Sequence, residues 1–174
     1  MVYDDETLVK KGGAANYHVA IDSRLGTAWK ELDFNDSGWK TSMLGIGFDN
    51  SSNPSTWYDH HLGLDAKAES SIKESMLMAK NSSVYIRIPF TVSRSQEIGR
   101  VVLNLRFDDG FVAWVNGVKV LSQNAPDPVQ WNSSATDSAS EKHARGSGVD
   151  FDITDHRDTI INAVSYTHLT LPTS

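Results

Sequence analysis

The chain has 174 residues, of which 39% are hydrophobic and 22% are charged, and its formal net charge is −6. This length and apolar content suit one folded domain and exclude a chain that is disordered throughout. The acidic balance and the lack of cysteine exclude a basic nucleic-acid-binding surface, disulfides and thiolate metal sites. No apolar run reaches the roughly 20 residues of a membrane-spanning helix, so we expect no membrane insertion.

Five tryptophans are spread along the chain. Trp29 and Trp39 lie in turn-rich segments and are expected to pack on the domain, because most tryptophan is largely buried. Trp57, followed by Tyr58, lies in a segment rich in Ser, Asn, Asp and His, and Trp131 lies in a long polar segment. Exposed aromatic rings can stack on sugar rings. Trp57, Tyr58 and Trp131 are therefore candidate carbohydrate contacts.

An acidic cluster lies around Asp33, Asn35 and Asp36. Carboxylate and amide oxygens are the ligands that calcium prefers, although the spacing does not match an EF-hand loop. Solvated turns are the alternative interpretation. Asp33 and Asp36 are thus the candidate ligands of a structural calcium ion, and we expect no other cofactor.

Residues 71–80 are predicted to form one short helix. Ser71 and Glu74 fit a capping box at its start. Ile72 and Met76 recur at helical spacing, which predicts one apolar stripe. So short a helix has to lean on a sheet to be stable.

Two segments in the middle of the chain show the alternation of β-strands. Apolar side chains alternate along residues 84–90 and again along residues 101–107, so each predicts a strand with one apolar face. Pro89 lacks an N–H donor, which predicts that the first strand ends, or lies at an edge, near that residue.

A hairpin is predicted next along the chain. Residues 111–115 are apolar on both faces, so alternation does not say which side points inward. Asn116 and Gly117 then favour a type I′ turn, which needs positive φ at both central residues, and residues 118–121 form the return strand. We expect these strands and the two before them to form one contiguous β-meander.

Asp108 and Asp109 are adjacent acids in a turn before Gly110. Neighbours in an extended strand point to opposite faces, so this pair does not converge on one bond as a general acid and base must. We interpret both as turn-capping residues. Residues 122–148 read as a long polar surface segment, residues 149–153 as a strand, and residues 155–162 as a turn or short helix.

Taken in order, several of these motifs resemble a galactose-binding-like, jelly-roll β-sandwich domain. The resemblance rests on residues 29–39, 44–48, 83–90 and 108–117, together with Asn124-Ala125-Pro126 and Trp131-Asn132-Ser133. Such domains recur in large exported bacterial proteins, beside lamin-tail, spore-coat-kinase-like (CotH) or glycosidase modules. The resemblance implies an all-β fold and an extracellular or cell-surface parent protein.

The end of the chain departs from that family pattern. Family members continue with a further strand where this chain reads Ile161-Asn162-Ala163. Residues 164–174 contain no charged residue and resemble a translated sequencing-adapter tail of metagenomic reading frames. We therefore expect residues 1–163 to be a jelly-roll domain lacking its last strand or strands, and residues 164–174 to be a non-native tail. A missing strand leaves an unpaired edge, so we expect marginal stability.

The leading functional hypothesis is a non-catalytic, carbohydrate-binding-like module whose partners are carbohydrate and neighbouring domains of the parent chain. The candidate ligand residues are Trp57, Tyr58, Arg87, Asp109, Asn116 and Trp131. The alternative is a structural spacer or docking domain without a ligand. A glycan-acting hydrolase is the third hypothesis, and it needs converging acids that the sequence does not offer.

Overall fold

The computed structural model describes residues 6–46, 81–92, 98–161 and 165–172. The strands are β1 (Ala14–His18), β2 (Lys40–Met43), β3 (Ser83–Phe90), β4 (Val102–Leu105), β5 (Phe111–Val115), β6 (Val118–Gln123), β7 (Val149–Asp152) and β8 (Ser165–Pro172). The short helices are η1 (Ala28–Lys30), α3 (Glu141–Arg145), η3 (Thr154–His156) and α4 (Arg157–Ile161). No helix in these ranges is long and apolar enough to cross a membrane.

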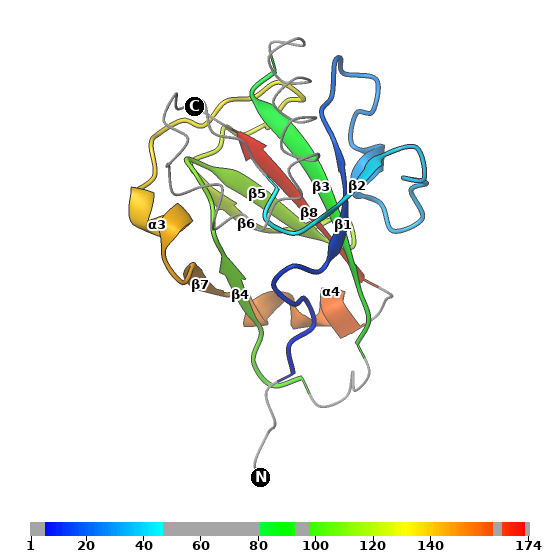
Figure 1. Ribbon diagram of the computed structural model, residues 1–174. Helices are drawn as coiled ribbons and strands as arrows, with labels where there is room; N and C mark the ends of the chain where they lie inside the picture. The colour runs from blue at the N-terminus through cyan, green and yellow to red at the C-terminus, as the bar shows by residue number, and fades with distance from the viewer. Residues whose placement is uncertain (1–5, 47–80, 93–97, 162–164, 173–174) are drawn as a thin grey trace.

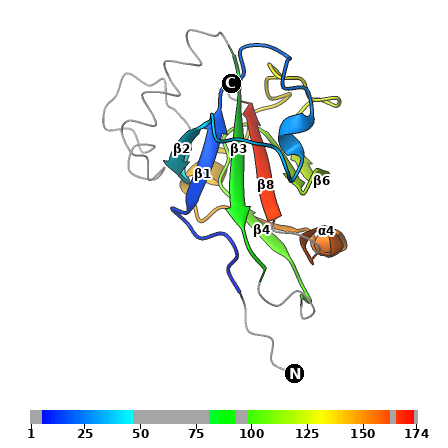
Figure 2. The same cartoon turned by 90° about the vertical axis from the view of Figure 1, so that its right-hand side faces the viewer.

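The fold is an all-β sandwich of antiparallel sheets, as the sequence predicted. A six-stranded sheet has the order β2-β1-β3-β8-β5-β6, and β4 and β7 form a second, two-stranded sheet. Figure 1 shows both sheets, and in Figure 2 the strands β2, β1, β3 and β8 lie side by side. Helix α4 lies at the end of the sandwich where β4 begins (Figure 1).

The predicted contiguous meander is wrong, although its hairpin is confirmed. Strand β4 leaves the large sheet and pairs with β7, because its apolar side chains Leu103 and Leu105 close the sandwich from the opposite side. Strand β8 separates β3 from β5. Strands β5 and β6 pair directly, and Asn116 (φ 51°) and Gly117 (φ 82°) have the positive φ that the predicted turn requires.

An inner core fills the space between the two sheets. Alternate residues of β3 point into it, as the alternation of the sequence predicted, and β4 and β7 cover it. Alternate residues of β5 also point into it, which the sequence had left open. Its buried members are Ala15, Tyr17, Val19, Ile46, Val84, Ile86, Ile88, Phe90, Phe107, Phe111, Ala113, Val115, Val120, Ile153 and Ile160. Burial of each large apolar side chain stabilises the fold by about 1.5–3 kcal/mol.

The outer face of the large sheet is also buried where β3 and β5 lie. The residues that alternate with the inner core, such as Tyr85 and Trp114, are covered by residues 19–39, the connector between β1 and β2. We call this group the outer aromatic cluster. Its buried members are Ala20, Trp29, Tyr85, Val112 and Trp114, and Leu25, Phe34, Trp39, Ala125, Val129 and Trp131 pack around them. Both faces of β5 are buried, which explains why its residues are apolar on both faces.

The last described strand lies inside the large sheet. Strand β8 pairs with eight residues of β3 and four of β5. This pairing does not show where the segment comes from. Two expectations therefore stay predictions: that residues 164–174 are a non-native tail, and that the domain comprises residues 1–163. The predicted helix at residues 71–80 lies outside the described residues.

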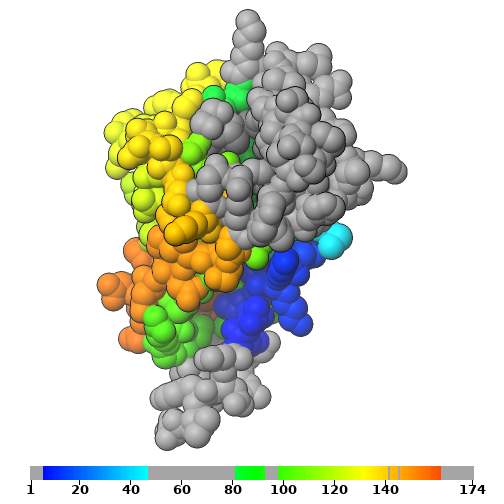
Figure 3. Space-filling model, turned by 60° about the vertical axis from the view of Figure 1, so that its left-hand side comes forward, coloured from blue at the N-terminus to red at the C-terminus, as the bar shows by residue number. Residues whose placement is uncertain are grey.

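The long polar segment 122–148 follows the surface as predicted. Figure 3 shows its yellow and orange atoms as a continuous band over one face. Helix α3 lies within this segment, where Ser140 caps the helix by accepting a hydrogen bond from the N–H of Lys142. The strand predicted at residues 149–153 is confirmed as β7, and residues 155–162 contain the predicted short helix, α4.

Candidate functional site

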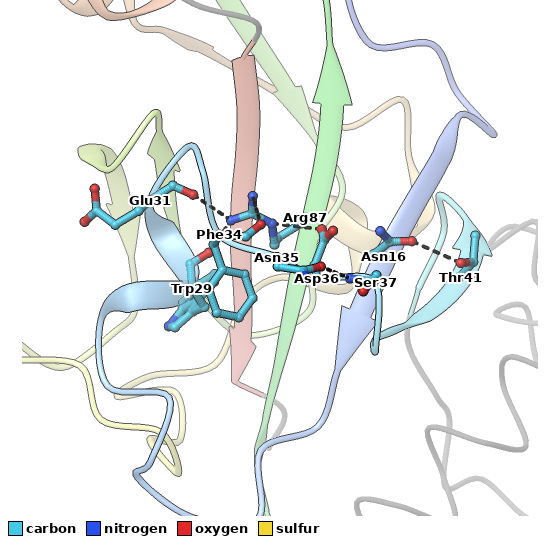
Figure 4. Close-up of polar contacts among 9 residues, drawn as sticks. All are labelled: Asn16, Trp29, Glu31, Phe34, Asn35, Asp36, Ser37, Thr41 and Arg87. Carbon is cyan, nitrogen blue, oxygen red and sulfur yellow. Dashed lines mark hydrogen bonds and ion pairs between the residues drawn. The ribbon is translucent and has the colours of Figure 1, made fainter.

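Arg87 is the centre of a polar cluster on the outer face of the large sheet. Its side chain is fully buried, with 0% exposure. Nε donates to the Asp36 carboxylate at 2.9 Å, Nη1 donates to the carbonyl oxygens of Trp29 and, at 3.0 Å, Glu31, and Nη2 reaches the Phe34 carbonyl oxygen at 3.5 Å. Figure 4 shows the connector wrapped around this guanidinium group.

These contacts bind the connector to the sheet. A guanidinium carries five N–H donors in a fixed fork, and here the acceptors are connector groups from residues 29–36. The guanidinium carbon also lies 5.2 Å from the centre of the Phe34 ring. Because no part of the Arg87 side chain reaches solvent, a sugar hydroxyl has no access to it. These contacts do not support the sequence-based assignment of Arg87 to a ligand, which stays a prediction.

The two candidate calcium ligands differ in their surroundings. The Asp36 side chain is 17% exposed and is paired with Arg87, whereas Asp33 is exposed. In the described ranges, no group of three or more His, Asp or Glu side chains is placed to hold a metal ion. Calcium binding at Asp33 and Asp36 stays a prediction, and at Asp36 the ion would share a carboxylate that Arg87 already binds.

The aromatic rings of the outer cluster form a continuous ladder. Trp29 stacks on Tyr85 with ring centres 4.2 Å apart and planes 9° apart, and it meets the edge of Trp114 at 5.5 Å. Trp39 stacks on Tyr85 at 6.5 Å, and His18 stacks on Trp39 at 5.3 Å. Each such pair adds about 0.5–1.5 kcal/mol beyond the area it buries. The ladder therefore runs from β1 across β3 to β5.

Ionisable groups lie at the two ends of this ladder. At the β5 end, the Lys30 ammonium lies 4.3 Å from the centre of the Trp114 ring. Burial lowers the pKa of Lys30, with opposing influences from nearby charges. At the β1 end, burial lowers the pKa of His18, and the Asp22 carboxylate partly opposes this shift. Between them, burial raises the pKa of Tyr85 to about 12.

Asp109 supports the long polar segment. It is 6% exposed, and its carboxylate accepts a hydrogen bond from the N–H of Ala139 at 3.1 Å, while its carbonyl oxygen accepts one from the Asn124 side chain at 2.8 Å. Asp109 itself has a positive φ of 61°. Gly110 is required for close approach, because a Cβ there would lie 2.5 Å from the Asn124 carbonyl oxygen.

The remaining predicted ligand residues are also placed. Asn116 donates from its side-chain amide to the Thr159 carbonyl oxygen, which joins the hairpin turn to α4. Trp131 is half-buried and packs against the outer aromatic cluster. Trp57 and Tyr58 lie outside the described residues. The structure therefore does not bring the predicted ligand residues in the described ranges together at one site.

The structure has a hollow beside Asp109 that the sequence analysis did not predict. It has a volume of about 240 Å³ and is lined by Asp109, Ala135, Thr136, Asp137 and Ser138. This volume is below the range of about 300–1,000 Å³ that is typical of ligand pockets. Hydroxyl and carboxylate groups in its lining suit a small polar group such as a sugar hydroxyl. The run of small polar residues at 133–138 was the available sequence signal.

Comparison with known proteins finds distant structural likeness. No family model matches the chain, and no curated protein matches it. Among solved structures, a glycosyl hydrolase family 2 member from Bacteroides cellulosilyticus is 12% identical, with a TM-score of 0.48, and the match covers 94% of this chain and 17% of that one.

Two further solved structures are β-glucuronidases. A calcium-binding mutant of β-glucuronidase 2 from Bacteroides uniformis is 11% identical, with a TM-score of 0.48 and coverage of 94% of this chain and 14% of that chain. A β-glucuronidase from an uncultured Clostridium species is 16% identical, with a TM-score of 0.44 and coverage of 98% and 23%. The chain thus spans between 14% and 23% of the length of these three proteins.

Proposed function

We propose that the chain is a non-catalytic β-sandwich module of a larger exported protein, and that its role is to present a rigid surface to neighbouring domains. One observation carries the proposal. Each of the three predicted polar ligand residues binds its own chain: Arg87 binds the connector, Asp109 binds the long polar segment, and Asn116 binds α4. These side chains hold loops in place. The sequence resemblance to modules of exported bacterial proteins supports the proposal that this chain belongs to a larger exported protein.

The energies of these contacts favour a rigid role. A hydrogen bond to a charged group contributes about 1.5–3 kcal/mol to stability, and a buried polar group left without a partner costs about 1–3 kcal/mol. A ligand that took Arg87 or Asp109 away from its partner would have to offset both amounts. Loops held in this way keep one shape, which is the property that a docking surface needs.

The adjacent acids also favour a non-catalytic role. Glycoside hydrolysis uses two carboxyl groups that face each other across the scissile bond, about 5–10 Å apart. Asp108 is exposed, whereas Asp109 is buried and holds Ala139. The two acids therefore have different environments and do not form a pair across one substrate. The hydrolase hypothesis has no support from them.

Affinity electrophoresis and a hydrolysis assay test the proposal. The intact chain is run through native gels that contain a panel of soluble polysaccharides, and it is incubated with a panel of aryl glycosides. A rigid docking module runs at the same mobility in every gel and releases no aryl alcohol. Retardation in any polysaccharide gel, or hydrolysis above that of buffer, contradicts it.

Carbohydrate binding is the second candidate, and the hollow beside Asp109 favours it. Asp137 is an exposed acid in its lining, and Asp127 is an exposed acid of the same segment that is paired with Lys119 at 3.2 Å. Asp137→Ala and Asp127→Ala each remove one negative charge, so they form a matched pair. Retardation that Asp137→Ala abolishes and Asp127→Ala preserves establishes binding at the hollow. Retardation unchanged by both places it elsewhere.

A further inference from the structure

We propose that Asn35 is an acceptor of an N-linked oligosaccharide, which an oligosaccharyltransferase transfers to its side-chain nitrogen. Residues 35–37 read Asn-Asp-Ser, which is the Asn-x-Ser pattern, or sequon, of an N-glycosylation acceptor. Asp33 lies two residues before Asn35, and bacterial single-subunit transferases select an acidic residue at that position. The proposal rests on the proposed export of the parent protein, since these transferases act on exported chains.

The same pattern occurs elsewhere in the chain, and the structure separates its copies. Sequons stand at residues 35–37, 50–52, 81–83 and 132–134, and an acidic residue precedes the asparagine by two positions only at Asn35. Residues 50–52 lie outside the described residues. Asn81 is 5% exposed, and its side-chain nitrogen donates to the carbonyl oxygens of Ala20 and Trp131. A transferase therefore has no access to the Asn81 amide group.

The Asn35 side chain is exposed and is held in one orientation. Its Oδ1 atom accepts a hydrogen bond from the N–H of Ser37 at 3.0 Å, as Figure 4 shows. A hydrogen bond to the amide oxygen polarises the amide group, so the protons on Nδ2 are lost more easily. Asn132 is also exposed, but at its sequon the Ser133 hydroxyl accepts from the N–H of Gln130 instead. Among the sequons of the described residues, the one at Asn35 alone is both exposed and polarised in this way.

The connector leaves room around this sequon for an enzyme and a glycan. The N–H of Trp39 donates to the Asp36 carbonyl oxygen at 2.8 Å, so Ser37 and Gly38 form the tip of a turn. Both tip residues are exposed, and a Cβ added at Gly38 would meet nothing within 4 Å. The Asp36 carboxylate is bound to Arg87 at 2.9 Å, which fixes the base of the turn on the sheet. The connector therefore presents the sequon outward from a fixed base.

The transfer is a substitution at a sugar carbon. The donor is an oligosaccharide linked through a diphosphate to a polyprenol. Nδ2 of Asn35 forms a bond to C1 of the first sugar, while the bond from C1 to the diphosphate oxygen breaks and its electron pair leaves with the polyprenyl diphosphate. Nδ2 gives up one proton to a base of the transferase, and nothing is oxidised or reduced. Because the attached glycan is bulky and hydrophilic, this side of the connector faces solvent in the parent protein, and the docking surface lies elsewhere.

A transfer reaction on the intact, folded chain tests the proposal. The purified chain is incubated with a purified bacterial single-subunit oligosaccharyltransferase, a polyprenyl-diphosphate oligosaccharide of known mass and a reference acceptor peptide. Trypsin cleaves after Lys30 and Lys40 and releases residues 31–40, which contain a single asparagine. Mass spectrometry of this peptide should show the added mass of one glycan. Because the reaction uses purified chain, its result is independent of export and of the docking role.

Single variants separate the sequon from the fold. Ser37→Ala removes the hydroxyl of the sequon but keeps the N–H that donates to Asn35, so it should lose the glycan while staying folded, and Ser37→Thr should keep the glycan. Asp33→Asn should lower the rate by at least about tenfold, because it removes a charged contact with the enzyme. Asn132→Gln, at the other exposed sequon, should leave the modification of residues 31–40 unchanged. Residues 31–40 without a glycan, in a mixture that modifies the reference peptide, would contradict the proposal, as would equal glycosylation of Ser37→Ala.

Discussion

Strands β3 and β5 are buried on both faces of the large sheet, but the two faces are buried in different ways. On the inner face, β3 contributes the apolar Val84 and Ile86, and a second sheet covers them. On the outer face, the same strand contributes Tyr85 and Arg87, and the connector covers them. The strands of a second sheet satisfy their main-chain groups by pairing, whereas the connector satisfies its main-chain groups partly by internal turns and partly through the Arg87 side chain.

This difference accounts for the buried charge of Arg87 on the outer face. Buried carbonyl oxygens need donors, and an irregular segment brings its carbonyl oxygens with it. Arg87 supplies those donors to Trp29, Glu31 and Phe34 in one side chain. In this chain, the buried arginine of β3 marks the face that the connector covers.

The largest expected effect comes from removing that donor. Arg87→Met should lower the free energy of unfolding by about 3–5 kcal/mol, because it leaves the Asp36 carboxylate and the connector carbonyl oxygens without their partner. Urea unfolding followed by circular dichroism measures the change.

The matched control for Arg87→Met is Arg100→Met. Arg100 is paired with Asp152 at 3.0 Å, but both side chains are largely exposed. An exposed ion pair contributes about 0–1 kcal/mol. Losses of equal, small size in the two variants would contradict the structural role of Arg87.

A second prediction compares the two faces directly. Trp29→Ala and Phe111→Ala each remove a buried aromatic ring, one from the outer cluster and one from the inner core, and each should cost about 3–5 kcal/mol. Thermal unfolding monitored in the near and far ultraviolet measures both. If Trp29→Ala loses its near-ultraviolet signal but unfolds at the original temperature, the outer cluster is dispensable and the account is wrong.

A smaller effect is expected at Asp36. Asp36→Asn keeps the shape of the side chain but removes its charge beside Arg87, which should cost about 1.5–3 kcal/mol. Asp33→Asn, on an exposed side chain of the same connector, should stay within about 0.5 kcal/mol. The Asp36→Asn loss should be the same in calcium and in chelator. A loss that appears only with calcium present would instead support the calcium site.

The inner half of the fold was predictable, because its signals are local. The alternation of residues 84–90 defines the core face of β3, and Asn116-Gly117 defines the hairpin. The partner of β4 was not predictable. Its alternation suits either sheet, and the pairing of Val102 with Asp152 depends on residues far along the chain.

The candidate site was predictable in residue type but not in role. The sequence analysis interpreted Asp109 as a turn-capping residue and offered both Arg87 and Asp109 as candidate ligand residues. The partners of Arg87 lie more than fifty residues earlier in the chain, and those of Asp109, Asn124 and Ala139, lie fifteen and thirty residues later. No local pattern encodes such contacts. The local sequence pattern of a polar residue is therefore the same whether its side chain faces a ligand or a loop of its own chain.

The smallest expected effect is a pH dependence from His18. Burial lowers its pKa below the ordinary value of 6.5, against the opposing Asp22 carboxylate. As the pH falls below 6.5, the unfolded chain takes up a proton that the folded chain does not, so stability decreases until the pH passes the folded-state pKa. The midpoint of thermal unfolding should therefore fall less between about pH 7.5 and about pH 5 in His18→Gln than in the unmodified chain.

The control for His18→Gln is His156→Gln, a change at a half-buried histidine beside α4. This variant should show the same change in the midpoint of thermal unfolding with pH as the unmodified chain. An equal loss of pH dependence in the two variants would assign the effect to general charge and not to the end of the aromatic ladder.

Amide hydrogen exchange of the connector tests the central claim most directly. The N–H groups of Ala28, Lys30, Glu31 and Trp39 are hydrogen-bonded within the connector, which Arg87 binds to the sheet. The account predicts that these amides are protected in the unmodified chain and lose that protection in Arg87→Met, while the amides of β5 and β6 keep theirs. Connector amides that exchange in the unmodified chain at the rate of an open loop would contradict it.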